Sequence, residues 1–198
     1  MLLGNGDGTF GTAVNYTTGN GPTSITLGDV NRDGILDIIT ANGTSNNASV
    51  LLGIGDGTFG VNTNFGTGTG SNPSSVTLGD VNGDGKLDII TANYGSNNAS
   101  VLLGNGNGTF LPKTDFVTGS NPRSVTLGDV NGDGRLDIIT ANLISNNASV
   151  LLGNGNGTFQ TQATFPTGSV PLSVTLGDVN GDGKLDIITA NKGSATSS

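Results

Sequence analysis

The sequence contains no cysteine, histidine, tryptophan or glutamate, and only 11% of its 198 residues are charged. Without cysteine, neither a disulfide scaffold nor a thiolate metal site can form. Histidine and glutamate are the usual general bases and cysteine is a common nucleophile, so their absence argues against an enzyme. All 15 acidic residues are aspartates.

Long hydrophobic runs and basic clusters are also missing. No stretch approaches the 18 apolar residues that a membrane span needs. The opening Met1-Leu2-Leu3 lacks the basic and apolar segments of a signal peptide. The seven Lys and Arg residues are scattered and the net charge is −8, which disfavours binding to phosphate backbones. We therefore expect neither membrane insertion nor a nucleic-acid partner.

Glycine and short apolar runs dominate what is present. The chain has 35 glycines, and Val, Ile, Leu, Thr and Phe recur in short runs between clusters of Gly and Asn. β-Branched and aromatic residues favour strands, whereas Gly and Asn favour tight turns. The composition therefore predicts an all-β fold.

Two motifs recur four times at a nearly constant spacing. Leu-Leu-Gly-x-Gly-x-Gly-Thr-Phe starts at residues 2, 51, 102 and 151, and Leu-Gly-Asp-Val-Asn starts at residues 27, 78, 127 and 176. In phase, residues 1–198 form a single domain of four repeats, 1–49, 50–100, 101–149 and 150–198. Repeats of this length are typical of propeller blades.

Each repeat contains four expected strands, which in the second repeat span residues 50–52, 58–65, 75–78 and 87–92. The last of these is apolar on both faces, as expected for a strand buried between neighbouring sheets. We therefore predict a β-propeller of four-stranded antiparallel blades. Two sets of aromatic residues are expected to pack between blades: Phe10, Phe59, Phe110 and Phe159, and Tyr16, Phe65, Phe116 and Phe165.

The ends of the chain raise the question of closure. The strands within residues 1–16 lack inner partners, and those at 173–176 and 185–190 lack outer partners. Pairing the two ends would complete the fourth blade and remove two open sheet edges. A four-bladed ring, an eight-bladed ring of two chains and a segment of a longer array are all compatible with this pattern. The two-chain ring would be a homodimer with twofold symmetry.

Each repeat also contains one nine-residue loop, 29–37, 80–88, 129–137 and 178–186. Asp occupies positions one, five and nine, Asn position three and Gly position six. Calcium prefers six to eight oxygen ligands, and Gly at position six lets the carbonyl of position seven face the ion. The predicted calcium ligands are Asp29, Asn31, Asp33, Ile35, Asp37, Asp80, Asn82, Asp84, Lys86, Asp88, Asp129, Asn131, Asp133, Arg135, Asp137, Asp178, Asn180, Asp182, Lys184 and Asp186, where Ile35, Lys86, Arg135 and Lys184 contribute their carbonyl oxygens.

Two other interpretations of the loops fit the pattern less well. A simple surface turn requires Asp-Gly but not the other two aspartates in fixed register, and magnesium demands strict octahedral geometry. Asn in place of a fourth carboxylate should weaken each site, which favours a calcium-rich setting outside the cell. Arg32 departs from the pattern because the other loops have glycine at its position.

The loop Asp-x-Asn-x-Asp-Gly-x-x-Asp-Ile-Ile, followed by Val-Leu-Leu-Gly-x-Gly-x-Gly-Thr-Phe, resembles the FG-GAP/VCBS repeat family across all four repeats. The resemblance implies a propeller of the integrin α-head type with calcium in its loops, bound by Asp29, Asn31, Asp33 and Asp37 and their equivalents. It also implies an extracellular or cell-surface module for adhesion or carbohydrate binding. The family's rings usually have seven blades, and the chain departs from this with four repeats. Because this blade type resembles those of wider rings, the resemblance favours the eight-bladed ring of two chains.

These observations predict a non-enzymatic, calcium-stabilised scaffold, with about four calcium ions per chain, that binds a protein or a surface. One alternative is a lectin with sugar sites between blades. Another is an engineered or amplified propeller fragment without a present ligand, which the near-identical repeats suggest. The Gly-rich segments do not predict a phosphate-binding loop because no lysine follows in the required position.

Overall fold

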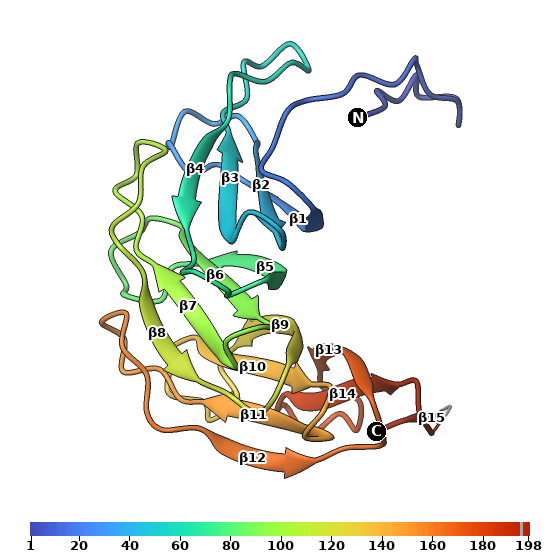
Figure 1. Ribbon diagram of the computed structural model, residues 1–198, viewed down its shortest axis with the longest axis vertical. Helices are drawn as coiled ribbons and strands as arrows, with labels where there is room; N and C mark the ends of the chain where they lie inside the picture. The colour runs from blue at the N-terminus through green and yellow to red at the C-terminus, as the bar shows by residue number, and fades with distance from the viewer. Residues whose placement is uncertain (195) are drawn as a thin grey trace.

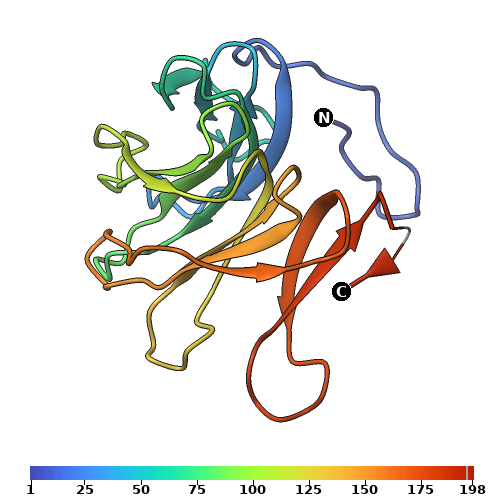
Figure 2. The same cartoon turned by 60° about the horizontal axis from the view of Figure 1, so that its bottom comes forward.

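The computed structural model describes residues 1–194 and 196–198. Antiparallel sheets follow one another along a C-shaped arc, with the N-terminus near one end and the C-terminus near the other (Figures 1 and 2). Among these residues, no helix is long and apolar enough to cross a membrane. The strands are β1 Pro22–Gly28, β2 Asp37–Asn42, β3 Asn47–Leu51, β4 Thr63–Gly66, β5 Pro73–Gly79, β6 Asp88–Asn93, β7 Asn98–Leu102, β8 Thr114–Val117, β9 Pro122–Gly128, β10 Asp137–Asn142, β11 Asn147–Leu151, β12 Ala163–Pro166, β13 Pro171–Gly177, β14 Asp186–Asn191 and β15 Thr196–Ser197.

The strands form four blades, each a meander of neighbouring antiparallel strands. Three sheets have four strands, β1–β4, β5–β8 and β9–β12, and the fourth contains β13, β14 and β15. The predicted all-β architecture is confirmed. The outermost strand is shorter than predicted: a strand was expected at residues 58–65, but β4 spans only Thr63–Gly66, and the Gly-rich hairpin before it contributes the single bridge Gly53–Phe59.

Ring closure within the chain, one of the assemblies considered, is not formed among the described residues. β14 pairs with β13 and β15, and residues 1–16 have no place in that sheet. These residues instead form a hairpin with one bridge, Gly4–Phe10, beside the first blade.

The second strand of each blade carries the same sequence, Asp-Ile-Ile-Thr-Ala-Asn. All six residues are buried in β2, β6 and β10, whereas only two of the six are buried in β14. A strand that is apolar on both faces needs a sheet on each side. The predicted two-sided burial is thus confirmed for three blades, and β14 lacks it because only one of its faces is covered by a neighbouring blade.

The hydrophobic core lies between blades. Ile39 and Val50 of the first blade pack with Val76 and Ile89 of the second, and equivalent residues join the next two pairs of blades. Edge-to-face aromatic pairs accompany these contacts, with ring centroids 5.1–5.3 Å apart. The pairs are Tyr16–Phe59, Phe65–Phe110 and Phe116–Phe159.

Two of the eight aromatic residues were predicted wrongly. Phe10 and Phe165 are exposed, although their sequence equivalents pack between blades. Each lies where a neighbouring blade would have to supply its partner. Equivalence in sequence therefore did not translate into equivalent burial at the ends of the arc.

A buried polar network, which the sequence did not predict, crosses each complete blade. Asn93 donates hydrogen bonds to Asn98 Oδ1 and Ser100 Oγ, both 2.7 Å long, and accepts one from Thr91 Oγ1 at 3.0 Å. Within the described residues, every buried side-chain nitrogen and oxygen has a hydrogen-bond partner. The network therefore satisfies polar groups that would be costly to bury unpaired.

Left-handed backbone conformation is required at position four of each Asp-rich loop. Gly83, Gly132 and Gly181 have φ between 74° and 78°, and each donates its N–H to the first Asp of its loop at 2.7 Å. Arg32 adopts the same conformation, with φ of 65°, although it carries a Cβ. A side chain in this region costs about 1–2 kcal/mol, so the first loop is strained.

Core burial is testable with a large-to-small substitution. Ile90→Ala should lower the free energy of unfolding by about 3 kcal/mol, because Ile90 is fully buried between blades. Val61→Ala is the control, since Val61 is 93% exposed and its loss should cost less than about 0.5 kcal/mol. Urea unfolding monitored by circular dichroism measures both. Equal effects of the two substitutions would contradict the inter-blade core.

The strain in the first loop is testable by exchange between loops. Arg32→Gly should raise the free energy of unfolding by up to about 1 kcal/mol, and Gly132→Arg should lower it by a similar amount. Thermal unfolding of the two variants beside the parent protein provides the measurement. Opposite signs are expected, and a loss of stability in Arg32→Gly would refute the strain at this position.

Candidate functional site

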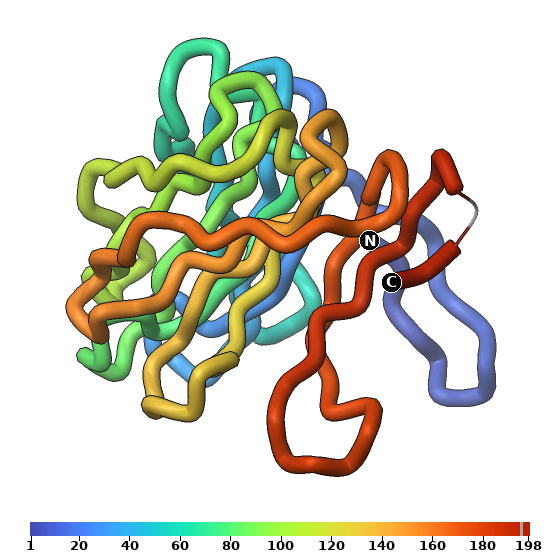
Figure 3. The backbone as a smooth tube through the Cα atoms, turned by 90° about the horizontal axis from the view of Figure 1, so that it is seen from below, coloured from blue at the N-terminus to red at the C-terminus, as the bar shows by residue number. Residues whose placement is uncertain are grey.

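The four Asp-rich loops connect the first and second strands of each blade. They are the β1–β2, β5–β6, β9–β10 and β13–β14 connections, and position nine of each loop is the first residue of the second strand. Figure 3 shows the β9–β10 and β13–β14 loops extending to the same side of the arc. The fold therefore repeats one acidic loop from blade to blade.

Backbone amides hold the first aspartate of each loop. In the third loop, Asp129 Oδ1 accepts hydrogen bonds from the N–H groups of Gly132 at 2.7 Å and Asp133 at 3.1 Å, and Oδ2 accepts one from Gly134 at 2.7 Å. These backbone donors lower the pKa of Asp129 from its usual value. Asp178 has the same contacts in the fourth loop, and its pKa is lowered for the same reason.

Positions three and five tighten the turn. Asn131 Oδ1 accepts the Asp133 N–H at 3.0 Å, and Asp133 Oδ1 accepts the Arg135 N–H at 2.9 Å. The glycine at position six has a positive φ in all four loops, between 77° and 84°. The loop backbone is thus fixed by the same side chains that were predicted to bind metal.

The aspartate at position nine has a different environment, because it is fully buried in the first three loops. Asp88 Oδ2 accepts the Val81 N–H at 2.9 Å, and Oδ1 accepts the Gly104 N–H at 2.7 Å. This side chain therefore joins the start of its loop to the Gly-rich hairpin of the same blade. Burial raises the pKa of Asp88 to about 6, even though these two backbone donors oppose the shift. Burial also raises the pKa of Asp37 and Asp137.

Lysines at position seven partly balance the acidic side chains of two loops. Lys86 Nζ lies 3.0 Å from Asp84 Oδ2, and Lys184 Nζ lies 3.6 Å from Asp182 Oδ2. The hydrogen bond from Lys86 lowers the pKa of Asp84. Both pairs are accessible to solvent, so each contributes less than about 1 kcal/mol to stability.

The donor set of each loop consists of the hard oxygens that calcium prefers: three carboxylates and one amide oxygen in nine residues. Across the described residues, no three acidic side chains lie close enough to form a metal cluster as they stand. A buried carboxylate beside two further acids is electrostatically unfavourable, and a cation would relieve it. The residue types therefore fit calcium.

The three aspartates outside the loops have structural partners. Asp7 and Asp56 accept hydrogen bonds from the backbone and hydroxyl of the threonine two residues later in the Gly-rich hairpins, and Asn107 and Asn156 do the same in the other blades. Asp115 accepts hydrogen bonds from the side chains of a serine on β7 and a lysine two residues before it. The recurrence at the hairpins identifies a turn-stabilising role.

Two small pockets lie between blades on equivalent aromatic pairs. One, of about 260 Å³, is lined by Asp115, Phe116, Phe159, Gln160 and Gln162 among others. Its counterpart, of about 270 Å³, is lined by Asn15, Tyr16, Phe59 and Asn62 among others. Each combines an aromatic ring with amide side chains, a combination the sequence motifs did not reveal.

Solved structures share the fold at low sequence identity. A lectin from Agrocybe aegerita, described for specific recognition of non-reducing terminal N-acetylglucosamine, is 22% identical with a TM-score of 0.59, covering 95% of this chain and 54% of that chain. Virginiamycin B lyase from Staphylococcus aureus is 16% identical with a TM-score of 0.58, and the match covers 90% of this chain and 55% of the lyase. A putative 6-phosphogluconolactonase from Bacteroides uniformis is 12% identical with a TM-score of 0.69, and the match covers 100% of this chain and 62% of the other. The chain thus spans little more than half the length of these proteins.

No curated protein matches the chain. The family model of the FG-GAP-like repeat, by contrast, matches four overlapping segments, residues 1–40, 36–91, 80–140 and 131–189. These segments contain both recurring motifs and all four Asp-rich loops. The chain therefore belongs to the FG-GAP-like repeat family.

Proposed function

We propose that this protein is a calcium-stabilised, non-enzymatic propeller-type scaffold that binds a protein or a surface outside the cell. The observation that carries the proposal is the fourfold recurrence of one loop with two aspartates near the surface and a third at the start of the central strand. This third aspartate, at position nine of the loop, is buried in three of the four blades. Surface turns alone would not require this third carboxylate in the core.

The contacts of the buried aspartate indicate what calcium would do. Asp88 already connects its loop to the Gly-rich hairpin through Val81 and Gly104. An ion held by the loop would neutralise this carboxylate and the two acids beside it. Calcium would thereby stiffen the edge of each blade, which is a structural role rather than a catalytic one.

The charge of the whole chain supports about one calcium ion per repeat. Twelve of the 15 aspartates lie in the four loops, and the formal net charge is −8. Four calcium ions would carry a charge of about +8. A fold that depends on one calcium ion per repeat fits a calcium-rich environment at the cell surface or outside the cell. It also fits a role in adhesion.

Calcium binding is tested by calorimetric titration of chelator-treated protein. We expect about four sites per chain and a melting temperature that rises with calcium, because an ion that binds the folded state stabilises it by mass action. Asp133→Asn should remove one site, since it weakens the third loop alone. Asp56→Asn, outside the loops, is the matched control and should leave the number of sites unchanged. An absence of calcium binding to the parent protein would overturn the proposal.

A lectin function is the second candidate, supported by the two inter-blade pockets. Sugar sites combine an apolar or aromatic surface with a few hydrogen-bonding groups, and both pockets offer an aromatic ring beside amides. The similarity to a lectin that recognises terminal N-acetylglucosamine makes this sugar a natural first probe.

A glycan array screened with the parent protein tests the lectin candidate. Binding should be lost in the double variant Gln162→Ala and Asn62→Ala, which removes one amide from each pocket. Ile144→Ala is the control, because Ile144 is 60% exposed and lines neither pocket. A silent array would favour a scaffold, or an amplified fragment without a ligand.

A further inference from the structure

The first blade exposes a surface that the other blades bury. Ile25 of β1 is 64% exposed. Its equivalent in the second blade, Val76, packs against the first blade and is only 6% exposed. Leu27 and Leu36 are likewise exposed, although the leucines at the same positions of the second blade pack between blades. This end of the arc therefore presents one half of an inter-blade interface.

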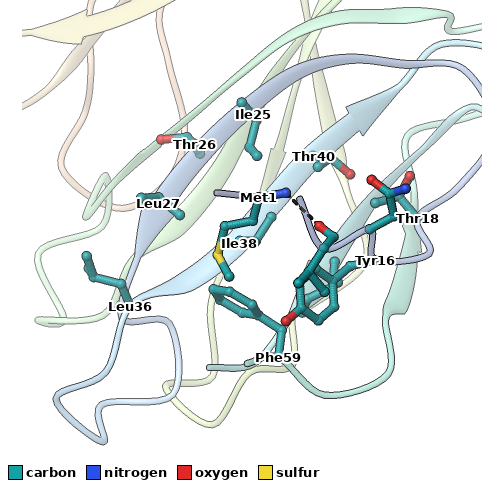
Figure 4. A pocket seen from close by; sticks show the side chains of 13 residues that line it. Met1, Tyr16, Thr18, Ile25, Thr26, Leu27, Leu36, Ile38, Thr40 and Phe59 are labelled. Atoms are coloured by element: carbon teal, nitrogen blue, oxygen red, sulfur yellow. Dashed lines mark hydrogen bonds between the residues drawn. The ribbon is translucent and has the colours of Figure 1, made fainter. Parts of the chain in front are cut away.

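A cavity of about 880 Å³ occupies this end, which we call the N-terminal groove (Figure 4). Its apolar lining includes Met1, Tyr16, Ile25, Leu27, Ile38 and Phe59. In Figure 4, the β1 side chains of Ile25, Thr26 and Leu27 lie on one side of the view and Tyr16 on the other, with Met1 and Ile38 between them. The groove thus lies between the N-terminal hairpin, residues 1–16, and the first blade.

The N-terminal hairpin has the contacts of the outer half of a blade. Gly11 N–H donates to the Leu3 carbonyl at 2.8 Å, as Gly60 N–H does to Leu52. The Leu3 side chain lies beside the Gly-rich hairpin of the next repeat, as the Leu52 side chain does one repeat later. Together with the Tyr16–Phe59 pair, these contacts place the hairpin one blade before the first. The groove is the space that the inner half of that blade would fill.

The other end of the arc exposes an inner half-blade that lacks a complete outer half. Val179 beside β14 is 72% exposed, whereas Val30 at the equivalent position is 2% exposed. Ala190 is exposed, although the equivalent alanines of β2, β6 and β10 are fully buried. The β13–β14 hairpin therefore presents the apolar surface that the groove lacks.

We propose that the N-terminal groove binds the β13–β14 hairpin of a second copy of this chain. In the first blade, Ile38 pairs with Leu51 and Ile39 with Val50. The same register would pair Ile187 with Leu2, and Ile188 with Met1, of the second copy. Reciprocal docking of two copies would complete two shared blades and close an eight-bladed ring with twofold symmetry.

Two side chains at the docking sites, Asp186 and Phe165, would gain from the second copy the partners that their equivalents have in the other blades. Asp186 Oδ2 accepts the Val179 N–H at 3.0 Å. In each of the first three blades, a glycine N–H also donates to the other carboxylate oxygen of the equivalent aspartate. The residue equivalent to that glycine is Gly4, at the opposite end of the arc. Phe165 and Phe10, the two exposed aromatic residues, would form the fourth edge-to-face pair of the series. A single docking geometry would satisfy both groups.

A second copy fits the groove better than the chain's own C-terminal hairpin. The groove and β14 lie at opposite ends of the arc (Figure 1), so the hairpin of the same chain does not face the groove. The groove itself contains no loop aspartate, whereas the docking hairpin carries Asp186, one of the predicted calcium ligands.

Sedimentation velocity of the 198-residue chain over a range of concentrations tests the proposal. One chain has a mass of 19.6 kDa, and the expected species has twice that mass. Ile25→Arg blocks the groove, and Ala190→Arg blocks the hairpin that enters it. Both positions are exposed in the single chain, so the fold should persist and each variant should sediment as one chain. Ile144→Arg, at an exposed site outside the groove, is the control and should remain a dimer.

Mixing the two blocked variants separates failed docking from failed folding. Ile25→Arg retains an intact hairpin and Ala190→Arg an intact groove, so the mixture should form a two-chain species that neither variant forms alone. A parent protein that sediments as one chain at every concentration would refute the proposal. So would a dimer that survives either blocking substitution, because its interface would then lie elsewhere.

Discussion

The structure depends on a strand that is apolar on both faces and can be buried only between two blades. Asp-Ile-Ile-Thr-Ala-Asn is enclosed in β2, β6 and β10, where both faces are covered, and is partly exposed in β14. Each blade therefore relies on its neighbours for burial, as in other repeat proteins. The same dependence leaves apolar surface at both ends of the arc.

This strand also sets the chemistry of the loops. Its first residue is the ninth residue of the loop, so burial of the strand carries one carboxylate into the core. There the carboxylate bonds the loop and the Gly-rich hairpin through two backbone amides, as Asp88 does with Val81 and Gly104. Metal binding at the edge would in this way be coupled to packing between the blades.

The sequence predicted features that follow from residue type and spacing. They include the strand that is apolar on both faces and the packing of most aromatic residues between blades. Phe10 and Phe165 were misplaced because their burial depends on a neighbour that a single repeat does not encode. The network around Asn93 was missed because Asn, Ser and Thr are abundant throughout, so its members do not stand out.

The proposed function depends on calcium in the four Asp-rich loops. An anomalous difference map from crystals grown with calcium tests it most directly. We expect one peak in each loop, with loop oxygens about 2.3–2.6 Å from it. A map without peaks in these loops, from crystals that contain calcium, would contradict it.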